Sequence, residues 1–236
     1  RETMIEFTIA LGRMVLEPIR SLGQIALLLL YCVRSLFTSG IAFRREIITQ
    51  CYVIGTQSLP VVLTTGAFAG AVFAYSFYNQ LVSLGVQSWS AALVLKMLTW
   101  HLGPVLTGLV LAGRIGCAIT AELGTMKVTE QVDALQTFGI EPVDYLVLPR
   151  VLAALVMCPI LTIFSIFIGI SSALFMIVCV MGGEAQYKMT QSRAFMLAYD
   201  YVQAMCKSAV FGLIIAVVSC RGGLATSGGA EGVGKA

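Results

Sequence analysis

The sequence contains few charged side chains. Lys, Arg, Asp and Glu make up 11% of the 236 residues, whereas 58% are hydrophobic and the mean hydropathy is +0.90. Soluble domains carry about 25% charged residues, so this composition excludes an ordinary soluble protein. The net charge of +3 gives no indication of nucleic-acid binding. The chain is therefore predicted to be an all-α polytopic membrane protein.

Catalytic and metal-binding patterns are also missing. Histidine occurs once, at His101, and no Ser-His-Asp set, HExxH motif or pair of intramembrane carboxylates can be assembled. None of the seven cysteines forms a CxxC pair, so they are predicted to act as small apolar residues in helices. The N-terminal stretch RETMIEFTIALGRMV lacks the pattern of a cleavable signal peptide. These absences predict a non-catalytic chain without a metal or cofactor of its own.

Residues 229–236, GAEGVGKA, nearly match the phosphate-binding motif GxxxxGK[ST]. Ala236 stands where the motif needs a hydroxyl to hold Mg²⁺, and no strand of a parallel sheet precedes the segment. We therefore expect a Gly-rich loop here. If transport is driven by ATP, the ATP is hydrolysed on a separate polypeptide.

Four stretches are long enough to cross a bilayer, which takes about 20 mostly apolar residues per helix. They cover roughly residues 51–78, 91–112, 150–182 and 195–220. The first contains Gly66 and Gly70 in a GxxxG pattern, which allows close helix contact. The length of the third indicates tilt, a kink at Pro159 or an end outside the membrane. Residues 46–236 are thus predicted to form a single transmembrane domain.

Residues 1–45 are amphipathic. Their longest mostly apolar run, residues 22–33, is too short to cross a bilayer unaided. We expect a helix that lies in the membrane interface and is broken at Pro18. The alternative is a true first span over residues 14–33, which would have to bury or snorkel Glu17 and Arg20.

The basic residues are unevenly distributed between the segments outside the spans. Residues 1–50 carry six, 114–150 carry three and 221–236 carry two, whereas the loops 79–90 and 183–194 carry only Lys188 and Arg193. Cytoplasmic loops are enriched in Lys and Arg. The N-terminus, the 114–150 loop and the C-terminal tail are therefore predicted to be cytoplasmic.

The predicted loop 114–150 contains a patterned helix. Val128, Val132 and Leu135 fall on one helical face, and polar residues occupy the other. Gly139 fits the position just after a helix, and Pro142 prevents its continuation. We expect a helix of about three turns that docks into a groove on a soluble partner. A solvated connector helix is the alternative.

The segments AGRIGCAITAELGTMKVTEQVDAL, GIEPVDYLVLPRVLA, KSAVFG and GGAEGVGKA resemble the MlaE/YrbE permease family of lipid-transporting ABC systems. The resemblance covers roughly residues 45–236. It implies an interfacial N-terminal helix and a cytoplasmic coupling helix, residues 120–138, between the second and third spans. The implied partners are a second copy of the chain, a cytoplasmic ABC ATPase, an MCE-domain lipid-binding protein, a small STAS-type accessory subunit and lipids.

The resemblance also assigns roles to residues. The implied contacts with the ATPase are Glu122, Leu123, Gly124, Met126, Glu130, Gln131 and Asp133. Two features depart from the family pattern. His101 stands where the family usually has an acidic residue, and the family continues into a fifth span, so this chain is expected to be truncated.

Polar side chains within the spans are the candidates for a substrate path: Lys96, His101, Asp200 and Lys207. A charge at the bilayer centre costs about 2.5–3.5 kcal/mol, so such groups should face the bundle interior, a wet cavity or an interface. Asp200, Gln203 and Lys207 share one helical face, with Lys207 placed to bind a lipid phosphate. The alternative is that this half of the helix is solvated on the periplasmic side and that Lys96 only snorkels.

The sequence thus predicts a permease subunit that couples a separate ATPase to movement of lipid, in the first place phospholipid, between the membrane and a periplasmic MCE protein. The predicted location is the bacterial inner membrane, with the plastid inner envelope as the alternative. Two other functions stay open. One is a secondary transporter or ion channel that uses Lys96, His101 and Asp200 as a relay, and the other is a scaffold whose cytoplasmic helix recruits an enzyme.

Overall fold

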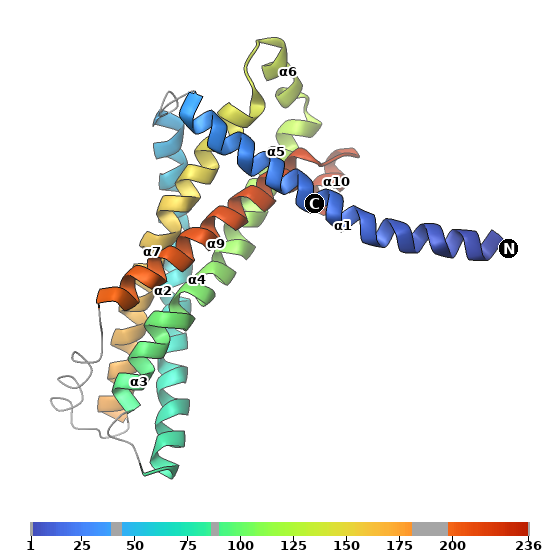
Figure 1. The fold of residues 1–236 in the computed structure, drawn as a ribbon. Coiled ribbons are helices and arrows are strands. Elements are labelled where there is room, and N and C mark those ends of the chain that lie inside the picture. The colour runs from blue at the N-terminus through green and yellow to red at the C-terminus, as the bar shows by residue number, and fades with distance from the viewer. Residues whose placement is uncertain (1, 39–43, 86–89, 181–197, 236) are drawn as a thin grey trace. The chain divides into compact units, whose positions relative to one another are not determined.

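The computed structural model describes residues 2–38, 44–85, 90–180 and 198–235, and their regular structure is helical throughout (Figure 1). Five helical stretches in this part of the chain are long and apolar enough to cross a membrane. They are Ile19–Leu36, Arg44–Ser83, Ala91–Val128, Val143–Cys179 and Ala198–Leu224. The predicted all-α polytopic fold is therefore confirmed.

The last four stretches correspond to the four predicted spans. The first lies in the N-terminal helix, for which an interfacial position stays a prediction. The predicted end of the third span at Gly182, the start of the fourth at Phe195 and the loop with Lys188 and Arg193 lie outside the described residues.

The helices form two compact units. The central unit comprises residues 45–118 and 150–216, and the terminal unit comprises residues 1–44, 119–149 and 217–236. The elements of the central unit, some of which extend beyond it, are α2 (Arg44–Ser83), α3 (Ser90–Met97), η2 (Leu98–Leu102), α4 (Gly103–Leu111), η3 (Ala112–Gly116), α7 (Leu148–Phe175), η5 (Met176–Val180) and α9 (Ala198–Leu224). The elements marked η are short π-helical segments within longer helices.

Helices α2 and α7 approach each other through glycines. A Cβ atom on Gly66 would lie 2.9 Å from the carbonyl oxygen of Ser165, and one on Gly70 would overlap the backbone of Gly169. The Ser172 hydroxyl, also on α7, donates a hydrogen bond of 2.7 Å to the Ala67 carbonyl. Small residues let helix backbones come this close in a membrane. The packing role predicted for the GxxxG pattern is confirmed.

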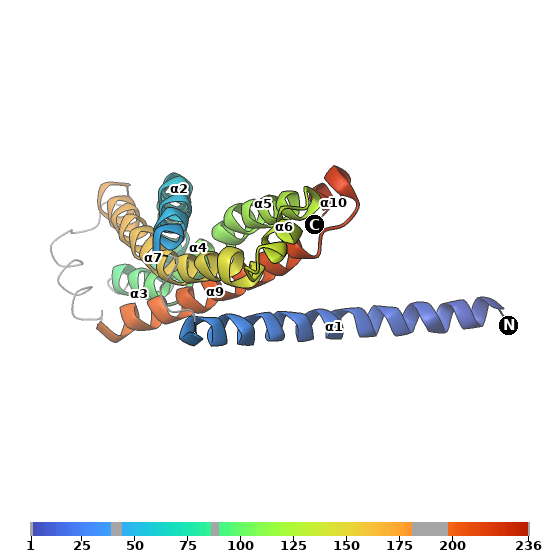
Figure 2. The same cartoon turned by 90° about the horizontal axis from the view of Figure 1, so that it is seen from above.

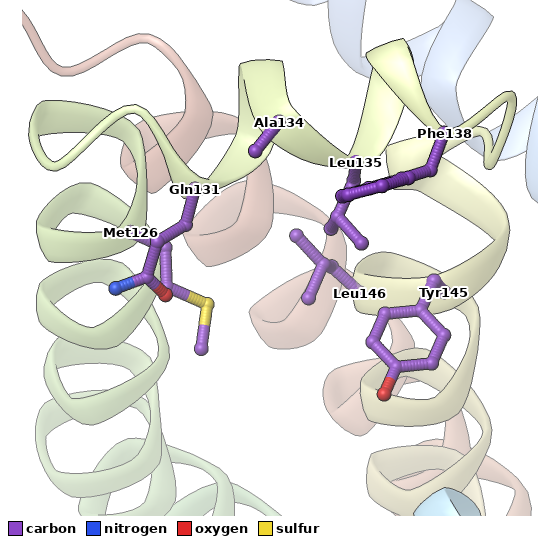
Figure 3. A pocket seen from close by; sticks show the side chains of 7 residues that line it. All are labelled: Met126, Gln131, Ala134, Leu135, Phe138, Tyr145 and Leu146. Carbon is purple, nitrogen blue, oxygen red and sulfur yellow. The ribbon is translucent and has the colours of Figure 1, made fainter.

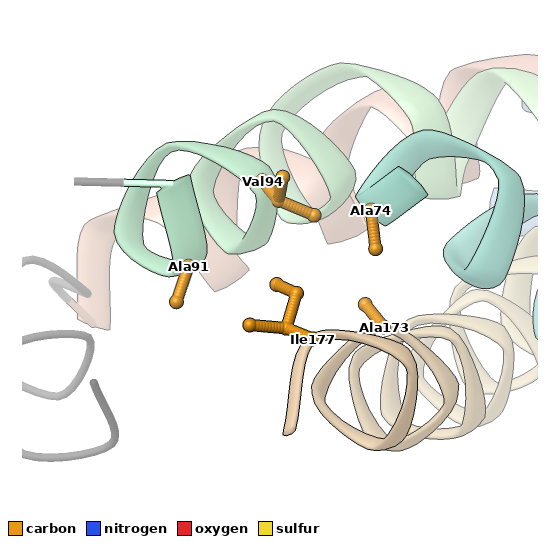
Figure 4. Close-up of a cluster of buried hydrophobic side chains, with 5 residues drawn as sticks. All are labelled: Ala74, Ala91, Val94, Ala173 and Ile177. Atoms are coloured by element: carbon orange, nitrogen blue, oxygen red, sulfur yellow. The ribbon is translucent and has the colours of Figure 1, made fainter. Parts of the chain in front are cut away.

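A cluster of small apolar side chains continues this contact toward α3. Its buried members are Ala74, Ala91, Val94, Ala173 and Ile177, from α2, α3, α7 and η5 (Figure 4). Phe77 and Met176 pack against the cluster. Three spans are therefore held together by close packing, which is the main source of helix association where lipid tails are as apolar as the side chains.

Helix α9 is joined to α7 by a buried polar contact. The hydroxyls of Thr162 and Ser208 lie 2.6 Å apart, and both residues are buried. Nearby, a Cβ atom on Gly212 would lie 2.7 Å from the Ala154 carbonyl oxygen, so this contact is also close. Pro159 lies inside α7 and does not end it.

The second span is longer than predicted. Helical structure runs without interruption from Ser90 to Val128, through η2 and η3. The loop predicted to begin at Arg114 is wrong, because Arg114 lies within η3 and donates a hydrogen bond of 2.7 Å to Ser58 on α2. The one proline in the stretch, Pro104, stands in the first turn of α4, where helices accept it.

The terminal unit contains α1 (Glu2–Thr38), most of α5 (Cys117–Val128), α6 (Gln131–Thr137), η4 (Val143–Val147), the end of α9 and α10 (Gly229–Lys235). The break predicted at Pro18 is wrong, since α1 is one continuous helix (Figure 2). A proline removes only one backbone amide donor, and the hydrogen bonds of the turns on either side remain, so the helix can continue through Pro18. Arg221 on α9 holds α1 through hydrogen bonds to Ser21 (3.0 Å) and Gln24 (2.8 Å).

The predicted Gly-rich loop over residues 229–236 is also wrong for its described part. Residues Gly229–Lys235 form α10, and a Cβ atom on Gly124 of α5 would lie 3.5 Å from the Val233 side chain. This packing stabilises a helix despite three glycines. In a helix the backbone amides point along the axis, so the segment does not form the open amide cradle of a P-loop.

Candidate functional site

Helix α5 and helix α6 form a hairpin, which we call the coupling hairpin (residues 117–139). After Val128 the chain changes direction at Thr129 and Glu130, and Glu130 has a left-handed backbone with φ of 61°. The Glu130 amide donates to the Lys127 carbonyl (3.2 Å), and the Thr129 hydroxyl donates to the Thr125 carbonyl (2.8 Å). The single helix predicted through Val128, Val132 and Leu135 is therefore wrong.

An ion pair bridges the two arms of the coupling hairpin. Lys127 Nζ lies 2.7 Å from Asp133 Oδ1, and the side chains are 34% and 52% exposed. An ion pair this open to solvent contributes only about 0–1 kcal/mol. It links α5 to α6 across the turn.

The end of α6 follows the prediction. The Gly139 amide donates to the Gln136 carbonyl (3.0 Å) and the Ile140 amide to the Leu135 carbonyl (3.1 Å). With Gly139 at φ of 75°, this is a Schellman motif. The stop signal at Gly139 is confirmed.

The predicted ATPase contacts fall into two groups. Glu122, Glu130, Gln131 and Asp133 are exposed on the coupling hairpin, and Met126 is half-buried. Leu123 and Gly124 are buried: a Cβ atom on Gly223 would lie 2.6 Å from Leu123 Cβ, and one on Gly124 would lie 3.0 Å from the Thr226 hydroxyl.

A hollow of about 280 Å³ lies beneath α6 (Figure 3). Its lining residues come from α5, from α6 and the residue that follows it, and from η4: Met126, Gln131, Ala134, Leu135, Phe138, Tyr145 and Leu146. Phe138 is 79% exposed, which is unusual for a large apolar side chain. The sequence pattern predicted that Leu135 lies on the apolar face of the helix. It gave no sign that Tyr145 and Leu146, which follow Pro142, would pack against the hairpin.

The central unit contains an apolar cavity with basic groups, which we call the α4–α9 cavity. Its volume is about 540 Å³, and its lining residues are His101, Val105, Cys206, Lys207, Val210 and Phe211, from η2, α4 and α9. Sequence reasoning identified the two basic residues. It missed the other four, because apolar residues in a span carry no sign of which neighbour they face.

Three of the four predicted path residues gather around Trp100. Lys207 Nζ donates a hydrogen bond of 2.8 Å to the Trp100 carbonyl and lies 5.8 Å from the centre of the indole. Lys96 Nζ lies 5.4 Å from the same indole, and the His101 and Trp100 rings are 5.3 Å apart. Both ammonium groups are within cation–π distance of the indole, which partly offsets their burial in a span.

Asp200 lies elsewhere. It is on α9, about 10 Å along the helix axis from Lys207, and it is not among the six residues that line the α4–α9 cavity. Its side chain is only 3% exposed, so the solvated end offered as an alternative does not describe this residue. On the same face, the Gln203 side-chain oxygen is buried without a hydrogen-bond partner in the described part of the chain.

Comparison of the sequence with known proteins identifies its family. The model of the family described as Permease MlaE matches residues 47–236. A "Probable ABC transporter permease protein" of Rickettsia bellii is 37% identical over 227 residues, which covers 96% of this chain and 87% of that protein. A protein of the same description from Synechocystis is 39% identical over 192 residues, covering 81% and 73%. "Protein TRIGALACTOSYLDIACYLGLYCEROL 1, chloroplastic" of Arabidopsis thaliana is 39% identical over 191 residues, covering 81% and 55%. The chain belongs to the MlaE permease family.

Proposed function

We propose that this chain is the permease subunit of an ABC-type transporter that moves lipid through the α4–α9 cavity, using ATP hydrolysed on a separate cytoplasmic ATPase. The observation that carries the proposal is the chemistry of the cavity: apolar walls with two basic side chains. The relatives named as ABC transporter permeases support the ATPase, and the Arabidopsis relative, named after a galactolipid, supports the lipid.

The volume and lining of the cavity fit part of a lipid. Ligand sites typically measure about 300–1,000 Å³, and this cavity is within that range at about 540 Å³. Val105, Val210 and Phe211 would contact acyl chains. Those chains are already in an apolar medium in the bilayer, so apolar walls alone add little selectivity. Recognition therefore depends on His101 and Lys207, which are suited to an anionic headgroup such as a phosphate.

A second copy of the chain would enclose the cavity. Val105 and Val210 line it and are 50% and 55% exposed, and the exposed apolar row continues along α9 to Ile214. A second α9 packed against this row would complete the wall. The proposed transporter is therefore a homodimer.

The coupling hairpin is the proposed docking site for the ATPase. Glu122, Glu130 and Gln131 present polar side chains to solvent at the end of a helix that is continuous with the second span. A displacement of the hairpin would pass along this helix to η2, which carries His101. Leu123 and Gly124 hold the hairpin in place and are not proposed as direct contacts.

The remaining parts of the proposal come from family membership and from the charge pattern. They are an MCE-domain protein that exchanges lipid on the far side of the membrane, a STAS-type accessory subunit and a cytoplasmic N-terminus in a bacterial inner membrane. A relay through Lys96, His101 and Asp200 is less well supported, because Asp200 does not line the cavity that His101 borders.

Cys206 offers a direct test of lipid in the cavity, because its exposed thiol lines it. In a variant that keeps only this cysteine, purified and delipidated in detergent, maleimide labelling is expected to slow about tenfold when phosphatidylglycerol is added at about ten times its dissociation constant. The matched control keeps only Cys117, which is exposed but does not line the cavity. Equal labelling of Cys206 with and without lipid would contradict the proposal.

A further inference from the structure

The Trp100 carbonyl cannot receive a hydrogen bond from the backbone at position 104. In an α-helix each carbonyl accepts a hydrogen bond from the amide four residues later. Four residues after Trp100 stands Pro104, which has no amide hydrogen. The Pro104 side chain is fully buried.

The π-helical segment η2 adds to the irregularity. The Gly103 amide donates to the Leu98 carbonyl, five residues earlier, instead of following the α-helical pattern. Gly103 has no room to change, since a Cβ atom on it would overlap Ile166 on α7. Pro104 can donate neither to Trp100, four residues earlier, nor to Thr99, five residues earlier, so position 104 supplies no backbone donor in either the α-helical or the π-helical register.

Lys207 on α9 supplies a donor to the Trp100 carbonyl. Its ammonium group is 2.8 Å from the Trp100 carbonyl oxygen, and its side chain is half-buried. In a membrane, freed backbone groups have to be satisfied by neighbouring helices, side chains or ordered water. The Lys207 ammonium group thus contacts Trp100 at two points: it donates to the carbonyl, and it lies 5.8 Å from the centre of the indole.

We propose that Lys207 is a positioning residue: its ammonium supplies the hydrogen bond that Pro104 withholds from Trp100, and this fastens η2 to α9. The bond fixes where His101, the next residue, lies in the α4–α9 cavity. The inference rests on the proposed function only for its transport readout. The positioning role differs from headgroup binding by Lys207, because the hydrogen bond to Trp100 forms without any lipid.

Hydrogen exchange measured by mass spectrometry on delipidated protein tests the inference. Lys207→Met is expected to raise amide exchange in a peptide covering residues 98–107 about tenfold, because an unsatisfied buried carbonyl favours local opening. Pro104→Ala restores an amide hydrogen at position 104. The double variant Lys207→Met/Pro104→Ala is therefore expected to return exchange to within about twofold of the wild type.

Lys96→Met is the matched control, because it removes the other ammonium group over the Trp100 indole. Pro104→Ala should not correct any effect of this change. Lys207→Arg keeps a cationic donor and is expected to stay near the wild type. If Lys207→Met alone does not fold, recovery of folded protein by the double variant supports the inference, and failure of both overturns it. Unchanged exchange in Lys207→Met, or no correction by Pro104→Ala, also overturns it.

ATP-dependent lipid movement in proteoliposomes separates this inference from the proposed function. Restored protection of η2 together with restored transport in the double variant supports positioning as the main role of Lys207. Restored protection with transport still lost supports positioning and adds headgroup binding. If the wild type itself moves no lipid, the proposed function fails, while the exchange data still decide the positioning role.

Discussion

Gly70→Leu is expected to abolish folding of the transmembrane domain. A Cβ atom at this position would overlap the backbone of Gly169 on α7, so no side-chain rotation can relieve the contact and the helices must separate. Extra methylenes in a packed core cost about 1–3 kcal/mol when side chains can adjust, and displacing a backbone costs more. Separation would also open the Ala74–Ala173 cluster farther along α2. The readout is the fraction of monodisperse protein in size-exclusion chromatography.

Gly113→Leu is the matched control for this change. It lies in η3 of the same unit, and nothing stands within 4 Å of the position of its Cβ atom. It should elute like the wild type with a similar melting temperature. A monodisperse Gly70→Leu protein that melts within a few degrees of the wild type would show that α2 and α7 do not meet at these glycines.

Glu130→Lys is expected to release the ATPase while leaving the permease folded. The Glu130 side chain is exposed at the turn of the coupling hairpin, and lysine takes the same left-handed backbone with similar strain. Removing one member of a buried, hydrogen-bonded charge pair at an interface costs about 2–5 kcal/mol, so if the ATPase buries Glu130 against a basic residue, retention of the ATPase should fall more than tenfold. The measurement is co-purification of the ATPase in mild detergent.

Glu130→Gly separates docking from folding. Glycine removes the carboxylate and also relieves the backbone at φ of 61°, by about 1 kcal/mol. This variant should melt at the same temperature as the wild type or higher, yet bind the ATPase less tightly. Co-purification that is unchanged in Glu130→Lys would remove Glu130 from the docking surface.

The spans and their closest contact could be predicted from the sequence. Apolar runs about 20 residues long have few alternatives to a membrane helix, and Gly66 and Gly70 mark where such a helix can approach another. The stop at Gly139 was equally readable, because glycine tolerates the left-handed backbone that ends a helix. These features are local, so each depends on residues close together in the chain.

The split of the coupling hairpin could not be predicted in the same way. The apolar spacing of Val128, Val132 and Leu135 continues across the turn, so periodicity indicates one helix. Glutamate at position 130 carries no signal for a left-handed backbone. The tertiary contacts of the hairpin are equally invisible in the pattern: Leu123 and Gly124 pack against Gly223 and Thr226, about a hundred residues later.

Only part of the lining of the α4–α9 cavity could be predicted from the sequence. Lys207 and His101 stood out because charge is rare in a span. Their meeting at Trp100 joins residues 107 positions apart, and the link to Pro104 becomes clear only once the hydrogen bond is seen. Pairing between distant helices is set by packing, and no single-sequence pattern encodes it.

The most direct test of the account is purification of the full-length protein from its native membrane in mild detergent, followed by mass spectrometry of the proteins and lipids that accompany it. We predict a nucleotide-binding ATPase in equal stoichiometry and a bound phospholipid. Recovery of the chain without an ATPase and without lipid, under every gentle extraction condition, would contradict the account. Such a result would favour a transporter driven by an ion gradient.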